Sequence, residues 1–276
     1  MLRLGSIDLD CPAVMGILNT TPDSFSDGGR FTNPTKALSH AEQMVTGGAA
    51  IIDIGGESTR PGAQAVGEQE EIDRVVPVIE AVHGAVDVPI SVDTSKPGVM
   101  RAAVAAGASM INDVRALRMD GALEAAAELQ QPVCLMHMLG QPRTMQQDPQ
   151  YDDVVGAVTQ FLRDRVAQCR QAGLGKDLIV IDPGFGFGKT PADNIELLAN
   201  LRQLLDIGPP VLIGVSRKST LGAITGREVD GRLSASITAA VLAVERGAQI
   251  IRAHDVAETV DALRVTRAVI ESDSNK

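Results

Sequence analysis

The segment LIVIDPG, residues 178–184, carries the pattern that decides the fold. It begins with four apolar residues and ends on Asp182, Pro183 and Gly184. A continuous Val/Ile/Leu run of this length is typical of a strand that is buried on both faces, as strands of parallel sheets are. The segment therefore predicts a parallel strand that ends on a carboxylate.

Seven other segments predict buried strands in the same way. They are VMGILN (14–19), IIDIGG (51–56), PISVDT (89–94), MINDV (110–114), PVCLMHM (132–138), PVLIGVS (210–216) and QIIRAHD (249–255). Stretches with helical periodicity lie between the strands, and the clearest one spans residues 152–172. The others fall near residues 34–47, 68–84, 97–107, 121–130, 193–206, 232–247 and 256–271, and Pro77 is expected to kink or restart the helix near 68–84.

This strict alternation, without a linker, predicts that residues 1–276 form a single (β/α)₈ TIM barrel domain with a disordered tail at 271–276. An open doubly wound sheet would show the same alternation. The polar residues favour the barrel, because nearly every strand starts apolar and ends on a polar or charged group. In a barrel these ends converge on one mouth, where catalytic groups lie. They are Asn19, Asp53 with Glu57, Asp93, Asn112 with Asp113, His137, Asp182, Ser216 with Arg217 and Lys218, and Arg252 with His254 and Asp255.

Composition excludes several classes of function. The net charge is −10, and with no Trp and one Tyr there is little to stack on bases, so nucleic acid is not an expected partner. No stretch has the roughly 18 uncharged apolar residues of a membrane helix, and the first ten residues lack a signal-peptide core. Three widely spaced cysteines predict neither a disulfide framework nor a zinc cluster. We therefore expect a cytoplasmic protein that is not bound to membranes.

Two segments after the first two strands are unusually long and polar. TTPDSFSDGGRF (20–31) contains the aromatic Phe25, and GGESTRPGAQAVGEQ (55–69) contains Arg60. Ordinary connectors in this fold have about two to six residues. Two long loops above one mouth instead predict a lid over a bound ligand.

At these segments the chain resembles a known family. GILNTTPDSFSDGG and GAAIIDIGGESTRPGA resemble the two signature segments of the dihydropteroate synthases. SVDTSKP, INDV, CLMHM, DPGFGFGK, GVSRKS and IIRAHDV resemble the remaining strand ends of that family, in order, so that the match runs from about residue 14 to about 267. The resemblance implies condensation of a hydroxymethyl-dihydropterin pyrophosphate with para-aminobenzoate, which gives dihydropteroate and pyrophosphate.

The resemblance also implies roles for individual residues. It places the pterin in a pocket formed by Asp93, Asn112, Met136, Asp182, Phe187, Gly214, Lys218 and Arg252. It places para-aminobenzoate against Phe25, Thr59, Arg60, Pro61 and Ser219, and the pyrophosphate against Asn19, Thr59, Arg60, Arg252 and His254. Asn19 would also be a ligand of Mg²⁺. The residues expected to carry catalysis are Asn19, Arg60, Lys218, Arg252 and His254, and a homodimer is expected.

The chemistry of the residues agrees with these roles, although simpler explanations exist. Asp182 can accept two N–H bonds from an amino-pyrimidine edge, but an Asp at a strand end can also cap the next helix. Arg252 and His254 are two residues apart and so lie on one side of their strand, beside the place where barrels bind phosphate. DPGFGFGKT does not fit the P-loop, because Pro stands at 183, and the spacing of Gly184, Gly186 and Gly188 does not fit GxGxxG. Arg217 has no clear role, and His137 is interpreted as structural.

These groups predict a dissociative substitution. Breaking the bond to pyrophosphate leaves positive charge on the pterin methylene and negative charge on the leaving oxygens. Mg²⁺, Arg252, His254 and Asn19 would stabilise the leaving group, so catalysis depends on positioning and electrostatics. The alternatives are a pterin-binding methyltransferase, a barrel that only binds pterin, and an unrelated barrel.

Overall fold

Eight parallel strands form a closed ring whose order follows the chain. The structure, a computed structural model, describes residues 1–20, 34–58, 63–140, 144–146 and 148–274. The strands are β3 (Ala13–Asn19), β4 (Ile51–Gly55), β5 (Ile90–Asp93), β6 (Met110–Asp113), β7 (Val133–Met136), β8 (Ile179–Asp182), β9 (Leu212–Ile213) and β10 (Ile250–Ala253). Their order in the sheet is β8-β7-β6-β5-β4-β3-β10-β9, and a parallel bridge from Ile181 to Val211 joins the two ends. The predicted barrel is confirmed, and a doubly wound sheet is excluded.

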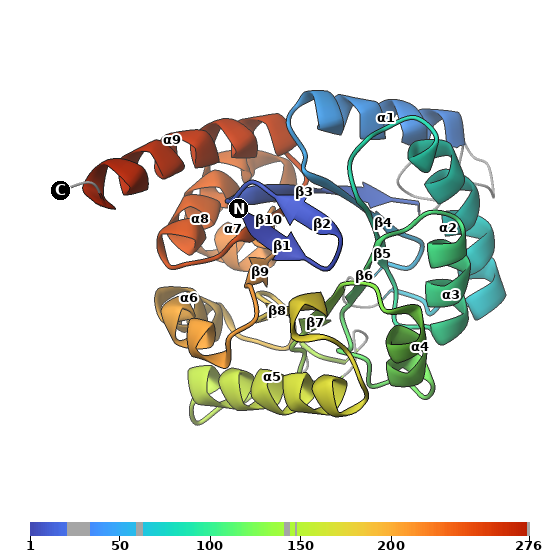
Figure 1. Cartoon of the computed structure of the whole chain (residues 1–276). Helices are drawn as coiled ribbons and strands as arrows, with labels where there is room; N and C mark the ends of the chain where they lie inside the picture. Colours follow the sequence, from blue (N-terminus) through green and yellow to red (C-terminus); the bar gives the residue numbers. More distant parts are fainter. Residues whose placement is uncertain (21–33, 59–62, 141–143, 147, 275–276) are drawn as a thin grey trace.

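Helices lie outside the ring, between successive strands (Figure 1). They are α1 (Pro34–Thr46), α2 (Glu68–His83), α3 (Pro97–Ala105), α4 (Ala122–Leu129), α5 (Val154–Gln171), α6 (Pro191–Ala199), α7 (Ser219–Thr225), α8 (Leu233–Glu245) and α9 (Val256–Ser274). Short 3₁₀ segments occur at η1 (Lys176–Leu178), η2 (Leu201–Ile207) and η3 (Val229–Gly231). Of the first loop expected to be long, only Thr20 lies within the described residues, whereas the second, at 55–69, lacks only residues 59–62.

Three details differ from the expectations. The helix expected at 193–206 ends at Ala199, where the Asn200 side chain donates to Glu196 O at 2.9 Å, and continues as η2. Helix α2 continues through Pro77, because buried neighbours such as Val75 and Val78 hold it on the core. Residues 271–274, expected as a disordered tail, form the last turn of α9, where Arg267 pairs with Glu271 one turn later.

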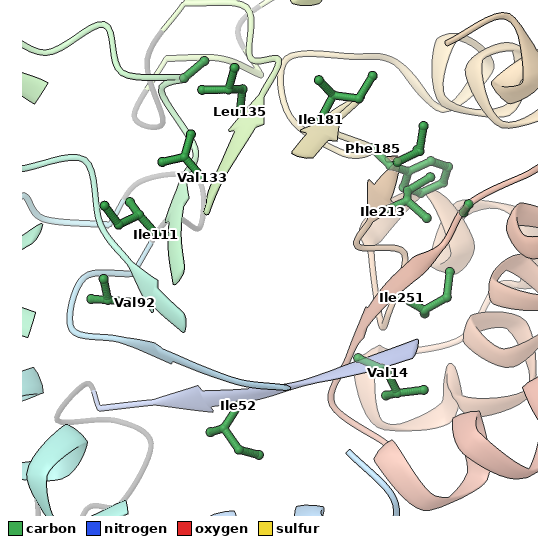
Figure 2. Packing of buried hydrophobic residues seen from close by; sticks show 14 of the residues in the cluster. Val14, Ile52, Val92, Ile111, Val133, Leu135, Ile181, Phe185, Ile213 and Ile251 are labelled. Atoms are coloured by element: carbon green, nitrogen blue, oxygen red, sulfur yellow. The ribbon is translucent and has the colours of Figure 1, made fainter. Parts of the chain in front are cut away.

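The alternation of side chains along each strand divides the interior into two parts. Val14, Ile52 and Ile111 belong to the large cluster between strands and helices, and Figure 2 shows them pointing away from the centre of the ring. The neighbouring positions point into the ring. Toward the amino ends of the strands these inward positions are apolar, and they are Ala13, Met15, Ile51, Met110, Cys134, Val180, Leu212 and Ile250. Toward the carboxyl ends most of them are polar, with Met136 among the exceptions.

A small hairpin closes the amino end of the barrel, as Figure 1 shows. Strands β1 (Leu2–Leu4) and β2 (Ile7–Leu9) pair in antiparallel fashion, and Leu4, Ile7 and Leu9 pack against the apolar inward positions. Gly5 N donates to Asp177 O at 3.0 Å and anchors the turn. The hairpin is not predicted from the sequence, because each strand has only three residues and the pattern of buried strands requires longer runs.

The outer layer of the core gives a first prediction. Ile111 is fully buried on β6. Ile111→Ala should lower the free energy of unfolding by about 2–5 kcal/mol, because it removes buried surface and leaves a cavity. Chemical denaturation measures this change. Ile224→Ala on α7 is the control, because Ile224 is 59% exposed, and it should change stability by less than about 0.5 kcal/mol. Equal stability of the two variants would contradict this view of the core.

Candidate active site

The inward positions at the carboxyl ends of the strands form a polar mouth. The register pairs Gly55 with Asp93, Asp93 with Asn112, and Met136 with Asp182, so these neighbours lie at one level of the barrel. Asn19 ends β3, and Arg252 lies near the end of β10. The structure therefore brings together the predicted strand-end residues, namely Asn19, Asp93, Asn112, Met136, Asp182, Gly214, Arg252 and His254.

Arg252 is the centre of the charged network in this mouth. Its Nε donates to Asp53 Oδ2 at 2.6 Å, and its Nη2 donates to Asp93 Oδ2 at 2.9 Å. Asn112 Nδ2 also donates to Asp53 Oδ2, at 3.0 Å. Burial raises the pKa of Asp93 to about 7, and Arg252 limits this rise. The network holds Arg252 and Asn112 in fixed positions within the mouth.

Asp53 is a site residue for which sequence analysis gave no role. Its side chain is fully buried, and Oδ1 has no hydrogen-bond partner within the described part of the chain. Buried polar atoms without a partner are rare, and they commonly mark a bound group or water. The available signal was the position of Asp53 as a charged, inward residue in an otherwise apolar strand.

Lys218 and Phe187 form one wall of the mouth. The Lys218 ammonium nitrogen lies 3.9 Å from the centre of the Phe187 ring, which is a cation–π contact. Burial, and after it the charge of Arg252, lower the pKa of Lys218 to about 8. Asp182 lies at the end of β8 and accepts from Gly184 N at 2.7 Å. Burial raises the pKa of Asp182 to about 6.

The turn DPGFGFGK holds Phe187 in this wall, and its glycines are needed for conformation. Gly184 has φ +70°, and a Cβ there would lie 1.8 Å from His137 O, so no side chain fits. Lys189 Nζ donates to Gly184 O and Phe187 O, each at 3.0 Å, and the Tyr151 hydroxyl donates to Gly188 O at 2.8 Å. The glycines thus allow this turn to lie close to the backbone of the loop after β7.

His137 and Lys189 form a buried pair behind this wall. Their nitrogens Nδ1 and Nζ are 3.0 Å apart, and the His137 ring also packs edge-on against Phe161. Burial, and after it the charge of Lys189, lower the pKa of His137 to about 2. Burial likewise lowers the pKa of Lys189 to about 7. The interpretation of His137 as structural agrees with these contacts, and Lys189 is a supporting residue that sequence analysis missed.

The loops after β9 and β10 are bonded to each other. His254 Nδ1 lies 3.0 Å from Ser216 Oγ, and Arg217 Nε donates to Asp255 Oδ2 at 3.0 Å. These contacts give Arg217 the structural role that its sequence position did not reveal. Ser219 is exposed at the start of α7. Phe25, Thr59, Arg60 and Pro61 lie outside the described residues, so their expected roles stay predictions.

The donor set at the mouth fits Mg²⁺ bound mainly through a phosphate ligand. Among the described residues, no group of three or more His, Cys, Asp or Glu side chains could hold a metal ion. Mg²⁺ bound to a phosphorylated substrate keeps several waters and takes only one or two oxygens from the protein. Asn19, half-buried at the end of β3, can supply one such oxygen.

Comparison with known proteins agrees with this geometry. The pattern of the pterin binding enzyme family matches residues 15–254. Dihydropteroate synthase of Escherichia coli K12 is 52% identical over 271 residues, which is 98% of this chain and 96% of that protein. A structure of the Xanthomonas albilineans dihydropteroate synthase with 4-aminobenzoic acid has TM-score 0.89 and 55% identity, over 94% of this chain and 93% of that one. A structure of the same enzyme with 7,8-dihydropteroate has TM-score 0.87 and 50% identity, over 97% of this chain and 98% of that one.

The barrel and its polar mouth thus define a pterin-binding enzyme, and the chain belongs to that family. Within the family it is a dihydropteroate synthase, a transferase of folate synthesis. This result favours the synthase over the methyltransferase that the polar strand ends left open. Among the described residues, no helix is long and apolar enough to cross a membrane.

The ion pairs of Arg252 give a prediction with a defined pH dependence. Arg252→Met leaves Asp53 and Asp93 buried without their cation, which should cost about 3–5 kcal/mol of unfolding free energy at pH 8. The pKa of Asp93, already raised to about 7, should rise further in the variant. A raised carboxyl pKa favours folding at low pH, so the loss should be smaller at pH 5, where Asp93 is protonated in both proteins.

Denaturation at pH 5 and pH 8 measures this difference. The control is Arg101→Met, because the Arg101–Glu128 pair is exposed, and it should cost less than about 1 kcal/mol at both pH values. A loss from Arg252→Met that is equal at the two pH values would show that Asp93 does not titrate as described.

Proposed function

We propose that this enzyme condenses 6-hydroxymethyl-7,8-dihydropterin pyrophosphate with para-aminobenzoate by a dissociative substitution. The products are 7,8-dihydropteroate and pyrophosphate. The observation that carries the proposal is the mouth itself, in which a buried carboxylate, a cation over an aromatic ring and a strand-end Arg/His pair converge. Relatives that hold 4-aminobenzoic acid and 7,8-dihydropteroate support the same substrate and the same product here.

The pterin would bind between the charged network and the Lys218 wall. Asp182, with Asn112 and Asp93 nearby in the register, offers acceptors and donors that match the amino-pyrimidine edge. Phe187 and the aliphatic part of Lys218 offer an apolar surface to the flat ring. Met136 and Gly214 complete the expected pocket, and Gly214 lacks a side chain that would narrow it beside Arg252.

The pyrophosphate would lie near Arg252 and His254, with Asn19 on the neighbouring strand. Strand β10 pairs directly with β3, so these residues face one region of the mouth. When bound, Mg²⁺ supplies charge that neutralises the leaving oxygens, and Asn19 would hold it. Arg252 adds a fixed positive charge, and its guanidinium plane can also stack on the pterin.

The bonds change in two stages. The C–O bond to pyrophosphate breaks first, and its electron pair leaves with the pyrophosphate while the electron-rich pterin stabilises the methylene cation. The neutral amine of para-aminobenzoate then forms the C–N bond and loses one proton to water. Ser219, with Phe25, Thr59, Arg60 and Pro61, would hold the carboxylate of para-aminobenzoate. Because no general base is required, fixed charges and position account for catalysis.

Two further expectations remain part of the proposal. A homodimer through the helices near the carboxyl end is supported by Val265 and Val269, which are one turn apart on α9 and 66% and 55% exposed. A cytoplasmic location is supported by Cys11, Cys134 and Cys169, which are all free thiols.

The assay that tests the reaction measures pyrophosphate release from the pterin pyrophosphate with Mg²⁺, with and without para-aminobenzoate. We expect release to require the amine and to match dihydropteroate formation mole for mole. Tight pterin binding without turnover would instead identify a barrel that only binds pterin. Absence of both binding and turnover would reject the proposal.

The two substrates should depend on different residues. Lys218→Ala should weaken pterin binding by about tenfold or more, because it removes the cation at the pocket wall. Arg60→Ala should leave pterin affinity close to that of the wild type and raise the KM for para-aminobenzoate. Calorimetry with the pterin and steady-state kinetics with the amine separate these effects. Equal losses of pterin affinity in both variants would contradict the division of roles.

A further inference from the structure

Two consecutive residues after β9 contact two consecutive residues after β10. Ser216 Oγ lies 3.0 Å from His254 Nδ1 and accepts from His254 N at 3.2 Å. Arg217 donates two hydrogen bonds to Asp255. The site assignments above give a role to His254 but none to Ser216.

The backbone around Ser216 is held firmly. Arg217 has φ +57°, an uncommon value for a residue with a side chain. Its N–H donates to Ser236 Oγ at 2.9 Å, and its carbonyl accepts from Arg232 Nη1 at 3.0 Å. These bonds fix the turn, and with it the position of the Ser216 hydroxyl beside the His254 ring.

The hydrogen bonds of Ser216 select one tautomer of His254. A backbone N–H can only donate, so Ser216 Oγ acts as acceptor toward His254 N. The hydroxyl then has one hydrogen to donate, and His254 Nδ1 is its acceptor at 3.0 Å. The opposite tautomer would direct two hydrogens at one oxygen and leave the hydroxyl hydrogen without an acceptor among the described residues. Nδ1 therefore carries no hydrogen, and the neutral ring carries it on Nε2.

The surroundings of His254 keep this ring neutral. Burial, and after it the cations Arg252, Arg217 and Lys218, lower the pKa of His254 to about 4 against the opposing effect of Asp255. Near pH 7 the ring is thus uncharged. His254 directly follows β10 and lies two positions after Arg252, so the alternation of the strand, continued by one residue, turns both side chains toward the mouth.

We propose that Ser216 is a positioning residue that holds His254 as the Nε2–H tautomer, so that His254 gives the departing anion a neutral hydrogen-bond donor. The identity of this anion as pyrophosphate rests on the proposed function. A donor fixed before the reaction costs no reorganisation when charge develops on the leaving oxygens. Arg252 supplies the positive charge at this place, and the Nε2–H group of His254 supplies a hydrogen bond with a defined direction.

Nitrogen NMR tests the tautomer without any substrate. The chain has four histidines, so spectra of the protein labelled with ¹⁵N in its imidazole rings are simple, and His254→Gln assigns the signals of His254. We expect an unprotonated Nδ1 and a protonated Nε2 at pH 7, and a mixture of tautomers in Ser216→Ala. A protonated Nδ1 in the wild type, either as the other tautomer or as imidazolium, would overturn the proposal.

Variants test whether Ser216 acts through His254. We expect Ser216→Ala to lower kcat by about tenfold with little change in the KM for para-aminobenzoate, and Ser216→Thr to restore most of the rate by returning a hydroxyl. In a His254→Ala background, Ser216→Ala should cost nothing further. A full loss from Ser216→Ala in that background would overturn the positioning role.

Two measurements separate this inference from the synthase proposal. Ser91→Ala removes another buried hydroxyl, one without a hydrogen-bond partner in the described chain, and it should retain the wild-type rate. Binding of inorganic pyrophosphate with Mg²⁺, followed by calorimetry, needs no turnover and should weaken in Ser216→Ala but not in Ser91→Ala. If the protein lacks synthase activity, the NMR and binding results still decide the role of Ser216.

Discussion

The ion pairs of Arg252 with Asp53 and Asp93 organise the upper half of the barrel. They connect β10 to β4 and β5 across the interior, at the level where the inward side chains change from apolar to polar. Two carboxylates this deeply buried would be costly to ionise without a cation between them. The same cation faces the mouth, so one residue both stabilises the barrel and provides the charge at the active site.

Burial of the charged side chains around this network explains the shifted pKa values in the mouth. Burial moves the pKa of Asp182 and of Lys218 toward neutrality, to about 6 and about 8. Charges and dipoles in such surroundings interact more strongly than in water and need little rearrangement during a reaction. A substitution that depends on stabilising separated charges, and not on a strong base, is the chemistry that this environment favours.

The sequence predicts the parts of this protein that depend on a repeated local pattern. Apolar runs ending on Asn19, Asp93, Asp182 and Arg252 predicted the strands and the face of the barrel that carries the site, because one rule of burial applies to every strand. The hairpin at residues 2–9 and the break of the helix at Asn200 were not predicted, since each depends on a few local contacts. The roles of Ser216 and Lys189 were not predicted, for another reason. Their roles arise from contacts with His254 and His137, 38 and 52 residues away in the chain, which no local pattern records.

The wall formed by Phe187 has an optical consequence. The chain contains no tryptophan, and the hydroxyl of its single tyrosine, Tyr151, is bonded to the backbone of the same turn that carries Phe187. Protein emission in the near ultraviolet is therefore very weak. Pterins absorb and fluoresce at longer wavelengths, so a pterin seated against Phe187 would be the dominant chromophore of the complex. Binding and release of the pterin by the unmodified enzyme can therefore be followed through the absorbance and fluorescence of the pterin itself.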